Sequence, residues 1–495
     1  MESATLTRPP AGSPAPSGPT ARLHVERWPL IGLVLLCAAT VFGFFYYPTY
    51  PNYDSLYSML WGRELLHGQP LSFEAYRAPT QHPLAIVFGA VLSLLGQDGD
   101  RVLIAITFVS FIVLVAGLYR LASRAFTPAV GLIAAGLLCT RFDFPFLAAR
   151  GYIDIPFLAM VVWAAALEQE QRRRGTPVFA LLALAALMRP EAWLIIGLYF
   201  LWCAYPASWS QRITYAAWTA AGPVIWALTD LAVTGDPMFS LTHTSGLAEE
   251  LGRAKGLSAV PSSTIDFLVR LDKAPVAIIG ILGFALAAYL VPRRIWMPTA
   301  LFLIGLGTFV MVGVAGLSVI QRYLLVPSLM VMVFAAVALG GFTMLEAGRL
   351  RTVWAAVAIL TVLGGVYYTT TRVNLHVFEN ELRFRGDSRN ALEDLLDNPK
   401  VRAGISCGPV SVPNHKQIAD VRWLLDLPKS QVIARTDETQ VERARRGGVA
   451  IYAANRAVLM RTVLIDGMKD PIMTQPLPGF RFVAASDGYG AYVRC

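Results

Sequence analysis

The chain has 495 residues, of which 55% are hydrophobic and 15% charged, and its mean hydropathy is +0.52. Soluble domains usually carry about 25% charged residues. The formal net charge of +9 would suggest a nucleic-acid ligand in a soluble protein. Here the arginines stand between apolar runs, where the positive-inside rule explains them better. These properties predict an α-helical polytopic membrane protein without a nucleic-acid partner.

The chain begins with a polar segment and then a long apolar run. Residues 1–20 are rich in Pro, Ser, Ala and Thr, which predicts a disordered tail over 1–27 that lies in the cytoplasm. The run 28–47 has no small-residue cleavage site after it, so we expect a retained signal-anchor. A multi-span membrane domain is predicted over 28–371.

Eleven apolar runs are predicted to cross the membrane: 28–47, 101–122, 127–142, 154–170, 176–189, 190–206, 212–234, 274–291, 295–318, 323–344 and 350–370. A further run, 82–96, would form a helix only ~22 Å long against a ~30 Å hydrocarbon core. If it does not cross, the arginine groups between the later spans all face the cytoplasm, as the positive-inside rule requires. If it crosses, those groups lie outside. We therefore expect 82–96 to be an interfacial or re-entrant helix.

This topology places many polar border segments on one face. The outer side receives the loop 48–100, the turns 142–154, 188–193 and 319–322, the loop 235–273, and everything after residue 372. A shared extracytoplasmic cavity is the simplest explanation. The segment 234–253, with His243, Glu249 and Glu250, is expected to be a solvated outer loop, with a role in the site as the alternative.

The last part of the chain, 372–495, is predicted to be a small extracytoplasmic α/β domain. Helical patterns occupy 388–398 and 417–427, and strand-like runs occupy 431–435, 448–454, 481–486 and 490–495. Cys407 and Cys495 would share an oxidising compartment, so a disulfide and two free buried thiols both remain open. The five cysteines show no spacing typical of a metal site.

Asp54 is the first candidate for chemistry. It follows the first span in "NYDSLY", and a helix starting there would put Tyr57 on the same face. A helix N-cap is the alternative role, and both roles can coexist. A carboxylate partly removed from water at the membrane border could have a raised pKa, which would suit a general base.

Two further border segments carry opposite charges. Arg150 and Asp154 in "ARGYIDIP" are four residues apart, so they could form a simple salt bridge or extend the site of Asp54. Arg189 and Glu191 interrupt about 30 apolar residues around Pro190. That break could be structural, but charges at membrane depth usually face a cavity or a partner.

Two more positions suit an anionic substrate. Arg322 and Tyr323 open a span, where they could anchor the interface or bind a phosphate through the guanidinium fork. His82, before Pro83, could be a helix cap or a substrate contact. No P-loop, Rossmann, zincin or nucleophile-elbow motif occurs. A transferase of this kind would therefore need a donor delivered through the membrane, such as a lipid phosphate.

In order and topology, residues 1–345 resemble the polytopic GT-C glycosyltransferases, in the branch of protein O-mannosyltransferases and lipid A aminoarabinose transferases. The likeness is carried by the acidic first loop, "QHPLA", "RGYIDIP" and "QRYLLVPSLMV". It implies an extracytoplasmic, usually inverting, transfer from a polyprenyl-phosphate sugar. By position, Asp54 matches the general base and Asp154 the second-loop acidic residue that helps to bind acceptor or phosphate.

The match departs from the family in two places. His82-Pro83 is followed by Leu84 where the family usually has a second proline, and Asp54 is followed by Ser55 where many relatives have a second acidic residue. A divalent cation as cofactor therefore remains open.

We expect a glycosyltransferase of the plasma membrane with Asp54 as base. Asp154, Arg150, Tyr57, His82, Arg189, Glu191, Arg322 and Tyr323 are expected to bind substrate. Its partners would be a polyprenyl-phosphate-linked sugar, membrane lipids, and a glycan, lipid or protein acceptor. A transporter or flippase for a lipid-linked or anionic solute is the alternative, although such proteins tend to show internal repeats and charges in mid-span.

Overall fold

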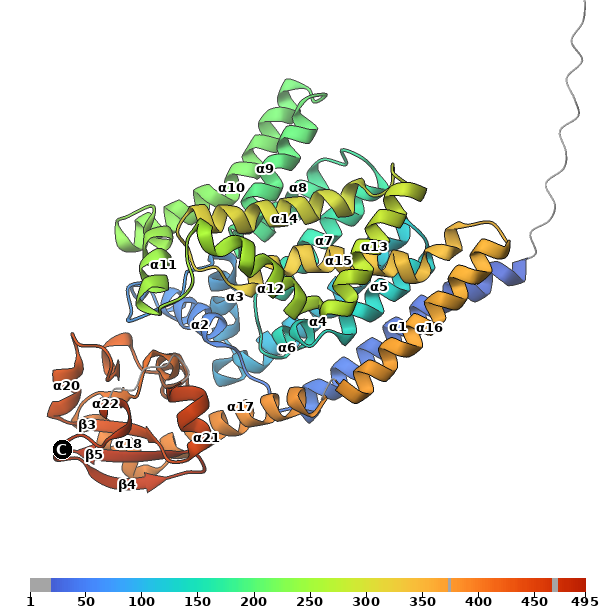
Figure 1. Cartoon of the computed structure of the whole chain (residues 1–495). Coiled ribbons are helices and arrows are strands. Elements are labelled where there is room, and N and C mark those ends of the chain that lie inside the picture. The colour runs from blue at the N-terminus through green and yellow to red at the C-terminus, as the bar shows by residue number, and fades with distance from the viewer. Residues whose placement is uncertain (1–18, 373–374, 465–470) are drawn as a thin grey trace, which may run out of the picture.

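The computed structural model describes residues 19–372, 375–464 and 471–495 (Figure 1). Of the predicted disordered tail, residues 1–18 lie outside this described part, while 19–27 belong to the first helix. The part before residue 373 contains the helices α1 Pro19–Tyr46, α2 Tyr53–Leu66, α3 Pro83–Ser93, α4 Gly99–Ala125, α5 Pro128–Thr140, α6 Asp143–Ala149, α7 Asp154–Glu170, α8 Thr176–Met188, α9 Glu191–Ala204, α10 Trp209–Thr234, α11 Phe239–Glu250, α12 Val260–Asp272, α13 Ala274–Leu290, α14 Trp296–Val314, α15 Leu325–Gly340 and α16 Arg349–Arg372.

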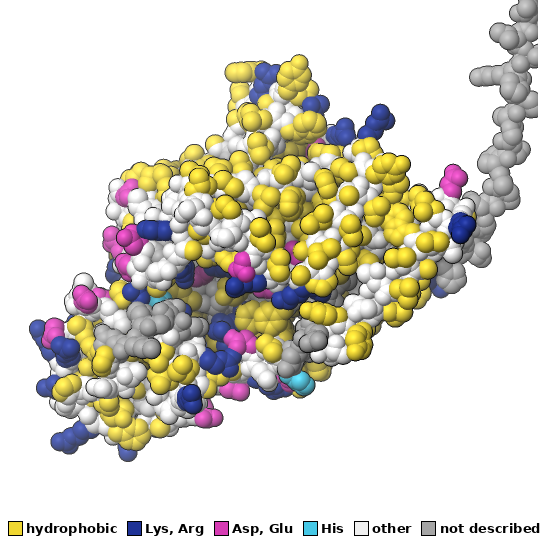
Figure 2. Space-filling model, viewed as in Figure 1, with side chains coloured by type: hydrophobic (Ala, Val, Ile, Leu, Met, Phe, Trp, Pro, Cys, Tyr) yellow, Lys and Arg dark blue, Asp and Glu magenta, His cyan; other side chains and the backbone are white. Residues whose placement is uncertain are grey.

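The helices before residue 373 have the lengths and apolar composition of a polytopic membrane protein. Six helical segments in the described residues are long and apolar enough to span a bilayer, or eight if each of two bent helix pairs forms one span. The bent pairs are α5 with α6, at 63°, and α12 with α13, at 101°. Hydrophobic side chains cover much of the visible surface of this part, as Figure 2 shows. All eleven predicted spans lie on helices, but several are short, so a count of eleven crossings stays a prediction.

The run 82–96 forms a short helix, α3, with eleven residues over Pro83–Ser93. Such a helix is only ~16 Å long, about half of a hydrocarbon core. It packs closely against α2: a Cβ atom added at Gly62 would lie only 2.2 Å from the backbone nitrogen of Ala90. The α2–α3 pair therefore needs glycine where the two backbones meet, and α2 begins the loop that was predicted to hold the site.

The C-terminal part contains a five-stranded mixed sheet in the order β2-β1-β3-β5-β4. Strand β1 pairs in parallel with β2 and β3, whereas β5 is antiparallel to β3 and β4. Four strands coincide with the predicted runs, and β1 was not predicted. The elements are α17 Leu375–Leu396, α18 Pro399–Gly404, β1 Val410–Val412, α19 Ile418–Leu425, β2 Val432–Ala434, α20 Val441–Arg446, β3 Gly448–Ala453, α21 Arg456–Val458, α22 Pro471–Thr474, β4 Arg481–Ala485 and β5 Tyr489–Arg494.

A disulfide crosslinks the C-terminal part, and a shared hydrophobic core joins it to the helical part. A disulfide joins Cys407 to Cys495, which is the first of the two alternatives left open by the sequence. One hydrophobic core also runs across the boundary, since Leu60 and Trp61 of α2 belong to the same buried cluster as Trp423 of α19. The two parts are therefore packed together as neighbouring layers of one molecule.

A buried ion pair crosses the same boundary. The Nη2 of Arg422, on α19, donates to Oε1 of Glu64, on α2, at 2.6 Å, and these side chains are 1% and 9% exposed. Ser72 supplies further hydrogen bonds to both partners. Nearby, Arg63 pairs with Asp426 at 2.8 Å. The helix that carries Asp54 is thus held by the C-terminal part through buried charge as well as apolar contact.

We expect Arg422→Met to lower the stability of the whole chain, because it leaves the Glu64 carboxylate buried without its cation. Breaking a buried pair from one side typically costs about 3–5 kcal/mol. Thermal unfolding in detergent, followed by tryptophan fluorescence, should show the loss. Glu64→Gln combined with Arg422→Met should recover most of it, and Arg443→Met, at an exposed position, should have little effect. An Arg422→Met variant as stable as the wild type would contradict the view that the Glu64–Arg422 pair holds the two parts of the chain together.

Candidate active site

Asp54 lies in the first turn of α2, and another residue caps this helix. The side-chain oxygen of Asn52 accepts from the backbone nitrogens of Asp54 at 2.9 Å and Ser55 at 3.4 Å. Asn52 also binds the backbone oxygen of Arg150 through its own backbone nitrogen, at 2.8 Å. The carboxylate of Asp54 is therefore not needed as a cap and is available for chemistry.

Arg322 joins the two aspartates that the sequence singled out. It lies on the short 3-10 helix Gln321–Leu324, just before α15. Its Nη2 donates to Oδ2 of Asp54 at 3.0 Å, and its Nη1 donates to Oδ2 of Asp154 at 3.3 Å. Because Asp154 begins α7 and is fully buried, the guanidinium fixes the ends of three elements against one another.

Arg189 extends this network. It sits at the C-terminal end of α8 in extended backbone, as expected for a residue before Pro190. Its guanidinium pairs with Asp154 and, at 2.5 Å, with Glu191, the first residue of α9. The break at Pro190 is therefore structural, and it also delivers two buried charges to the site.

Arg150 does not pair with Asp154, contrary to the simple salt bridge considered from their spacing. Gly151, at φ 64°, ends the helical path between them, so α6 stops at Ala149 and α7 starts at Asp154. The Cζ of Arg150 instead lies 4.3 Å from the ring centre of Tyr50. Its Nε and Nη1 are buried and have no hydrogen-bond partner among the described residues.

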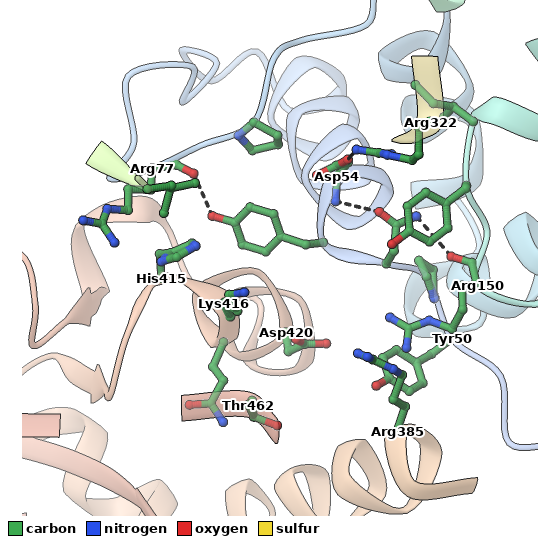
Figure 3. A pocket seen from close by; sticks show the side chains of 18 of the residues that line it. Tyr50, Asp54, Arg77, Arg150, Arg322, Arg385, His415, Lys416, Asp420 and Thr462 are labelled. Carbon is green, nitrogen blue, oxygen red and sulfur yellow. Dashed lines mark hydrogen bonds and ion pairs between the residues drawn. The ribbon is translucent and has the colours of Figure 1, made fainter. Parts of the chain in front are cut away.

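These groups surround a cavity of about 400 Å³ at the junction of the two parts of the chain (Figure 3). Figure 3 shows Asp54 and Arg322 together at one end, and Arg150, Tyr50 and Arg385 together at another. His415, Lys416 and Asp420, from the C-terminal part, also line the cavity. The shared extracytoplasmic cavity expected from the topology thus has a counterpart that both parts of the chain build.

The structure brings most of the predicted site residues together. Those that line the cavity are Asp54, His82, Arg150, Arg189, Arg322 and Tyr323. Asp154 and Glu191 lie just behind it as partners of the arginines. Tyr57 does not reach it, because its ring is fully buried against Tyr53 and Trp61.

His82 occupies the N-cap position of α3, but its side chain makes no capping hydrogen bond. Burial, and next the positive charge of Arg189, lower the pKa of His82 to about 3. The imidazole is therefore neutral at physiological pH, and its Nδ1 is buried without a partner among the described residues. It can donate or accept one hydrogen bond but cannot add positive charge.

Positive charge exceeds negative charge around the cavity. Nine basic side chains line it among the residues that the structure describes: Arg77, Arg150, Arg189, Arg253, Arg322, Arg385, Arg389, Arg461 and Lys416. Seven carboxylates line it or pair with these cations: Asp54, Asp100, Asp154, Glu191, Glu250, Glu381 and Asp420. Among the described residues, basic side chains thus outnumber the two carboxylates that themselves line the cavity, Asp54 and Asp420, as suits an anionic ligand.

The segment 234–253 contains a helix, α11, with a turn after it, and is not the loop that was expected, although Glu249 and Glu250 are exposed. Helix α11 and the turn after it close one side of the cavity through Thr244, Leu247 and Arg253. The hydroxyls of Thr80 and Thr244 lie 2.6 Å apart, which joins α11 to the first loop. Sequence reasoning missed this wall and the basic residues after 372, because only packing brings these distant segments together.

The carboxylates do not fit a divalent cation. Only Asp54 and Asp154 converge, and Arg322 stands between them with a hydrogen bond to each. The described residues contain no group of three His, Cys, Asp or Glu side chains that could hold a metal ion. The guanidinium supplies the positive charge that a cation would bring between these aspartates.

An apolar hollow leads from the site toward the other end of the helices. Arg322, Tyr323 and Glu191 border a small gap, which shares Ile195 with an apolar groove of about 260 Å³. This groove lies between α7, α8, α9 and α14 and reaches Trp202 and Trp296. The groove has room for part of a hydrocarbon chain, whereas the gap of about 10 Å³ between it and Arg322 is too narrow for one in this conformation.

Comparisons with known proteins give a fold and no sequence relative. No protein-family model matches the chain, and no curated protein matches it in sequence. Among solved structures, ArnT from Cupriavidus metallidurans bound to undecaprenyl phosphate matches with a TM-score of 0.55 and 12% identity, over 93% of this chain and 97% of that one. The apo oligosaccharyltransferase of Archaeoglobus fulgidus matches with a TM-score of 0.54 and 13% identity, over 94% of this chain and 74% of that one.

Both solved proteins are membrane glycosyltransferases of the GT-C type, and each match covers nearly all of this chain. At such low identity the likeness concerns the arrangement of helices and domains. It agrees with the resemblance found in the first loop and at the "RGYIDIP" and "QRYLLVPSLMV" segments. The chain therefore has the GT-C fold.

Proposed function

We propose that this protein is a membrane glycosyltransferase that moves a sugar from a polyprenyl-phosphate donor to an acceptor hydroxyl on the extracytoplasmic side. The observation that carries the proposal is the carboxylate of Asp54, held by Arg322 at the wall of a cationic cavity. An inverting transfer needs a proton acceptor beside the attacking hydroxyl and positive charge near the departing phosphate. Asp54 and the basic lining supply these two elements.

Asp54 acts as the base in its ionised form. Burial raises its pKa, but the charge and hydrogen bond of Arg322 outweigh burial, and the pKa of Asp54 lies below its usual value. This differs from the raised pKa expected from the sequence, because the guanidinium partner was not foreseen. A weak base of this kind takes the proton late, once the hydroxyl oxygen has begun to bond to the anomeric carbon.

The donor phosphate leaves beside Arg322. Asp54 and Asp154 each accept a hydrogen bond from the guanidinium of Arg322. The Arg322 side chain is still 32% exposed, so further N–H groups of it face the cavity. Neutral His82 and the hydroxyl of Tyr323 line the same wall. They would orient the sugar or the phosphate by hydrogen bonds without changing the local charge.

The lipid tail would follow the apolar groove between α7, α9 and α14. The groove connects through Ile195 to the gap beside Arg322, so a headgroup at Asp54 and a tail among the helices are compatible. ArnT, which shares the fold, was solved with undecaprenyl phosphate bound. That ligand has the chemistry that the charged cavity and the apolar groove require together.

The proposed side of the membrane rests on charge and on the disulfide. Helix α7 starts at Asp154 in the site and ends at Glu170, which pairs with Arg120 at 2.6 Å and Arg174 at 3.3 Å. Arginines thus gather at the end of α7 far from the cavity, as the positive-inside rule expects of a cytoplasmic face. The Cys407–Cys495 disulfide suits the oxidising side for the C-terminal part.

Asp54→Asn should reduce sugar transfer by about 10²–10⁴-fold, because the amide cannot accept the proton. The measurement uses the purified protein in vesicles, a set of labelled polyprenyl-phosphate sugars, and cell-envelope material as acceptor. Glu74→Gln, on an exposed carboxylate of the same loop, is the matched control. Undiminished transfer by Asp54→Asn would exclude it as the base, and movement of lipid-linked sugar across the vesicle without transfer would favour a flippase.

The acid limb of the pH–rate profile should report the contact between Asp54 and Arg322. A lowered pKa keeps Asp54 ionised as pH falls, so the wild-type rate should decline only below the usual range of an aspartate. In Arg322→Met, burial still raises the pKa of Asp54, but the positive charge that opposed it is gone. The acid limb should therefore move to higher pH by about one unit or more. Each profile is normalised to its own maximum. Identical limbs in both proteins would show that Arg322 does not set the ionisation of the base.

A further inference from the structure

A second group of cations lies in the cavity away from Asp54. Arg150 follows α6 and is only 7% exposed, yet its Nε and Nη1 have no hydrogen-bond partner among the described residues. A buried charged donor without a partner destabilises the protein, because it has lost the hydrogen bonds that it would make to water. Since Arg150 lines the cavity, a small rotation of its guanidinium would bring these donors to a ligand there.

A second guanidinium faces the first. Arg385, on α17, lines the same end of the cavity, where Figure 3 shows it beside Arg150 and Tyr50. Burial, and next the positive charge of Arg150, lower the pKa of Arg385. Two like charges from separate elements are therefore held close together, an arrangement that an anion between them would stabilise.

Nearby carboxylates do not neutralise this pair. Glu381 accepts from the Nε of Arg385, but it also pairs with Arg461. Asp420 lies near enough for the charge of Arg150 to act on it, but it also pairs with Arg389, so each of these carboxylates serves two arginines. Tyr50 holds Arg150 through its ring face, which orients a guanidinium without cancelling its charge. Arg150 and Arg385 thus share their nearest described carboxylates with other arginines.

The donor phosphate would not use this pair. A lipid donor enters from the helices, through the groove that meets the cavity at Arg322 and Tyr323. Arg150 and Arg385 instead lie where the helical part meets α17, on the side from which a second substrate would approach. An acceptor with its hydroxyl at Asp54 would place a neighbouring group at this pair.

We propose that Arg150 and Arg385 form a subsite for an anionic group, a phosphate or a carboxylate, carried by the acceptor close to the hydroxyl that receives the sugar. The preferred acceptor is then an acidic glycan or lipid. That the anion belongs to the acceptor rests on the proposed function. That an anion binds here rests on the buried donors of Arg150 and on the two neighbouring guanidinium charges. Arg150 and Arg385 bind and position the acceptor, and Asp54 remains the catalytic residue.

Inorganic phosphate is the probe for this subsite. Full-length protein in nanodiscs is first saturated with polyprenyl phosphate, and binding of labelled phosphate is then measured by equilibrium dialysis. We expect one phosphate still to bind, and Arg150→Gln and Arg385→Gln each to weaken it about tenfold or more, as for a lost charge-assisted hydrogen bond. Arg383→Gln, on the same helix but paired with Glu379, should bind phosphate as the wild type does.

The outcomes separate the two proposals. If polyprenyl phosphate displaces inorganic phosphate in equal amount, the pair belongs to the donor site and the acceptor subsite is wrong. Unchanged phosphate binding by both glutamine variants, with folding checked by thermal unfolding, would also overturn it. If polyprenyl phosphate fails to bind while phosphate binds through Arg150 and Arg385, the subsite stands and the proposed lipid donor is wrong.

Discussion

The buried network of Arg322 and Arg189 with Asp54, Asp154 and Glu191 constrains the rest of the structure. Charges in so dry a position are costly unless each is paired, and a missing partner would leave a bare charge among apolar helices. Each member comes from a different helix end: the start of α2, the start of α7, the break between α8 and α9, and the turn before α15. Pairing therefore fixes where five helix ends meet. The same pairing lowers the pKa of Asp54, which faces the cavity, so the constraint that organises the helices also favours the ionised form that the proposed base would need.

The C-terminal part completes this site from the other side. Its core is continuous with that of α2, and the Glu64–Arg422 pair ties the two together about three turns beyond Asp54. The basic lining is shared in the same way, with Arg322 from the helical part and Arg385 and Lys416 from the C-terminal part. A donor from the membrane and an acceptor from outside would thus meet at a wall built by both. This division explains why one end of the cavity opens toward an apolar groove and the other toward paired arginines.

The membrane class, the helix positions and most site residues could be predicted because apolar runs and charges at their borders leave a direct mark on the sequence. Asp54, Asp154, Arg189 and Arg322 stood out for that reason, and they meet as expected. The pairing did not follow, since Gly151 separates Arg150 from Asp154 and Arg322 comes from 268 residues beyond Asp54. For the same reason the pKa of Asp54 was expected to shift in the wrong direction. Arg385 and Lys416 lie in an ordinary polar segment, and no local pattern connects them to a cavity built by packing.

The central claim is that the reacting sugar lies in the cavity beside the Asp54–Arg322 pair, with the acceptor subsite at Arg150 and Arg385 left free. The most direct test is a cryo-electron microscopy structure of the protein in nanodiscs with a polyprenyl-phosphonate sugar that cannot be cleaved. We expect the phosphonate to contact Arg322, the anomeric carbon to face the cavity within reach of Asp54, and the tail to follow the groove past Ile195. A headgroup bound at Arg150 and Arg385, or outside the cavity, would contradict the account.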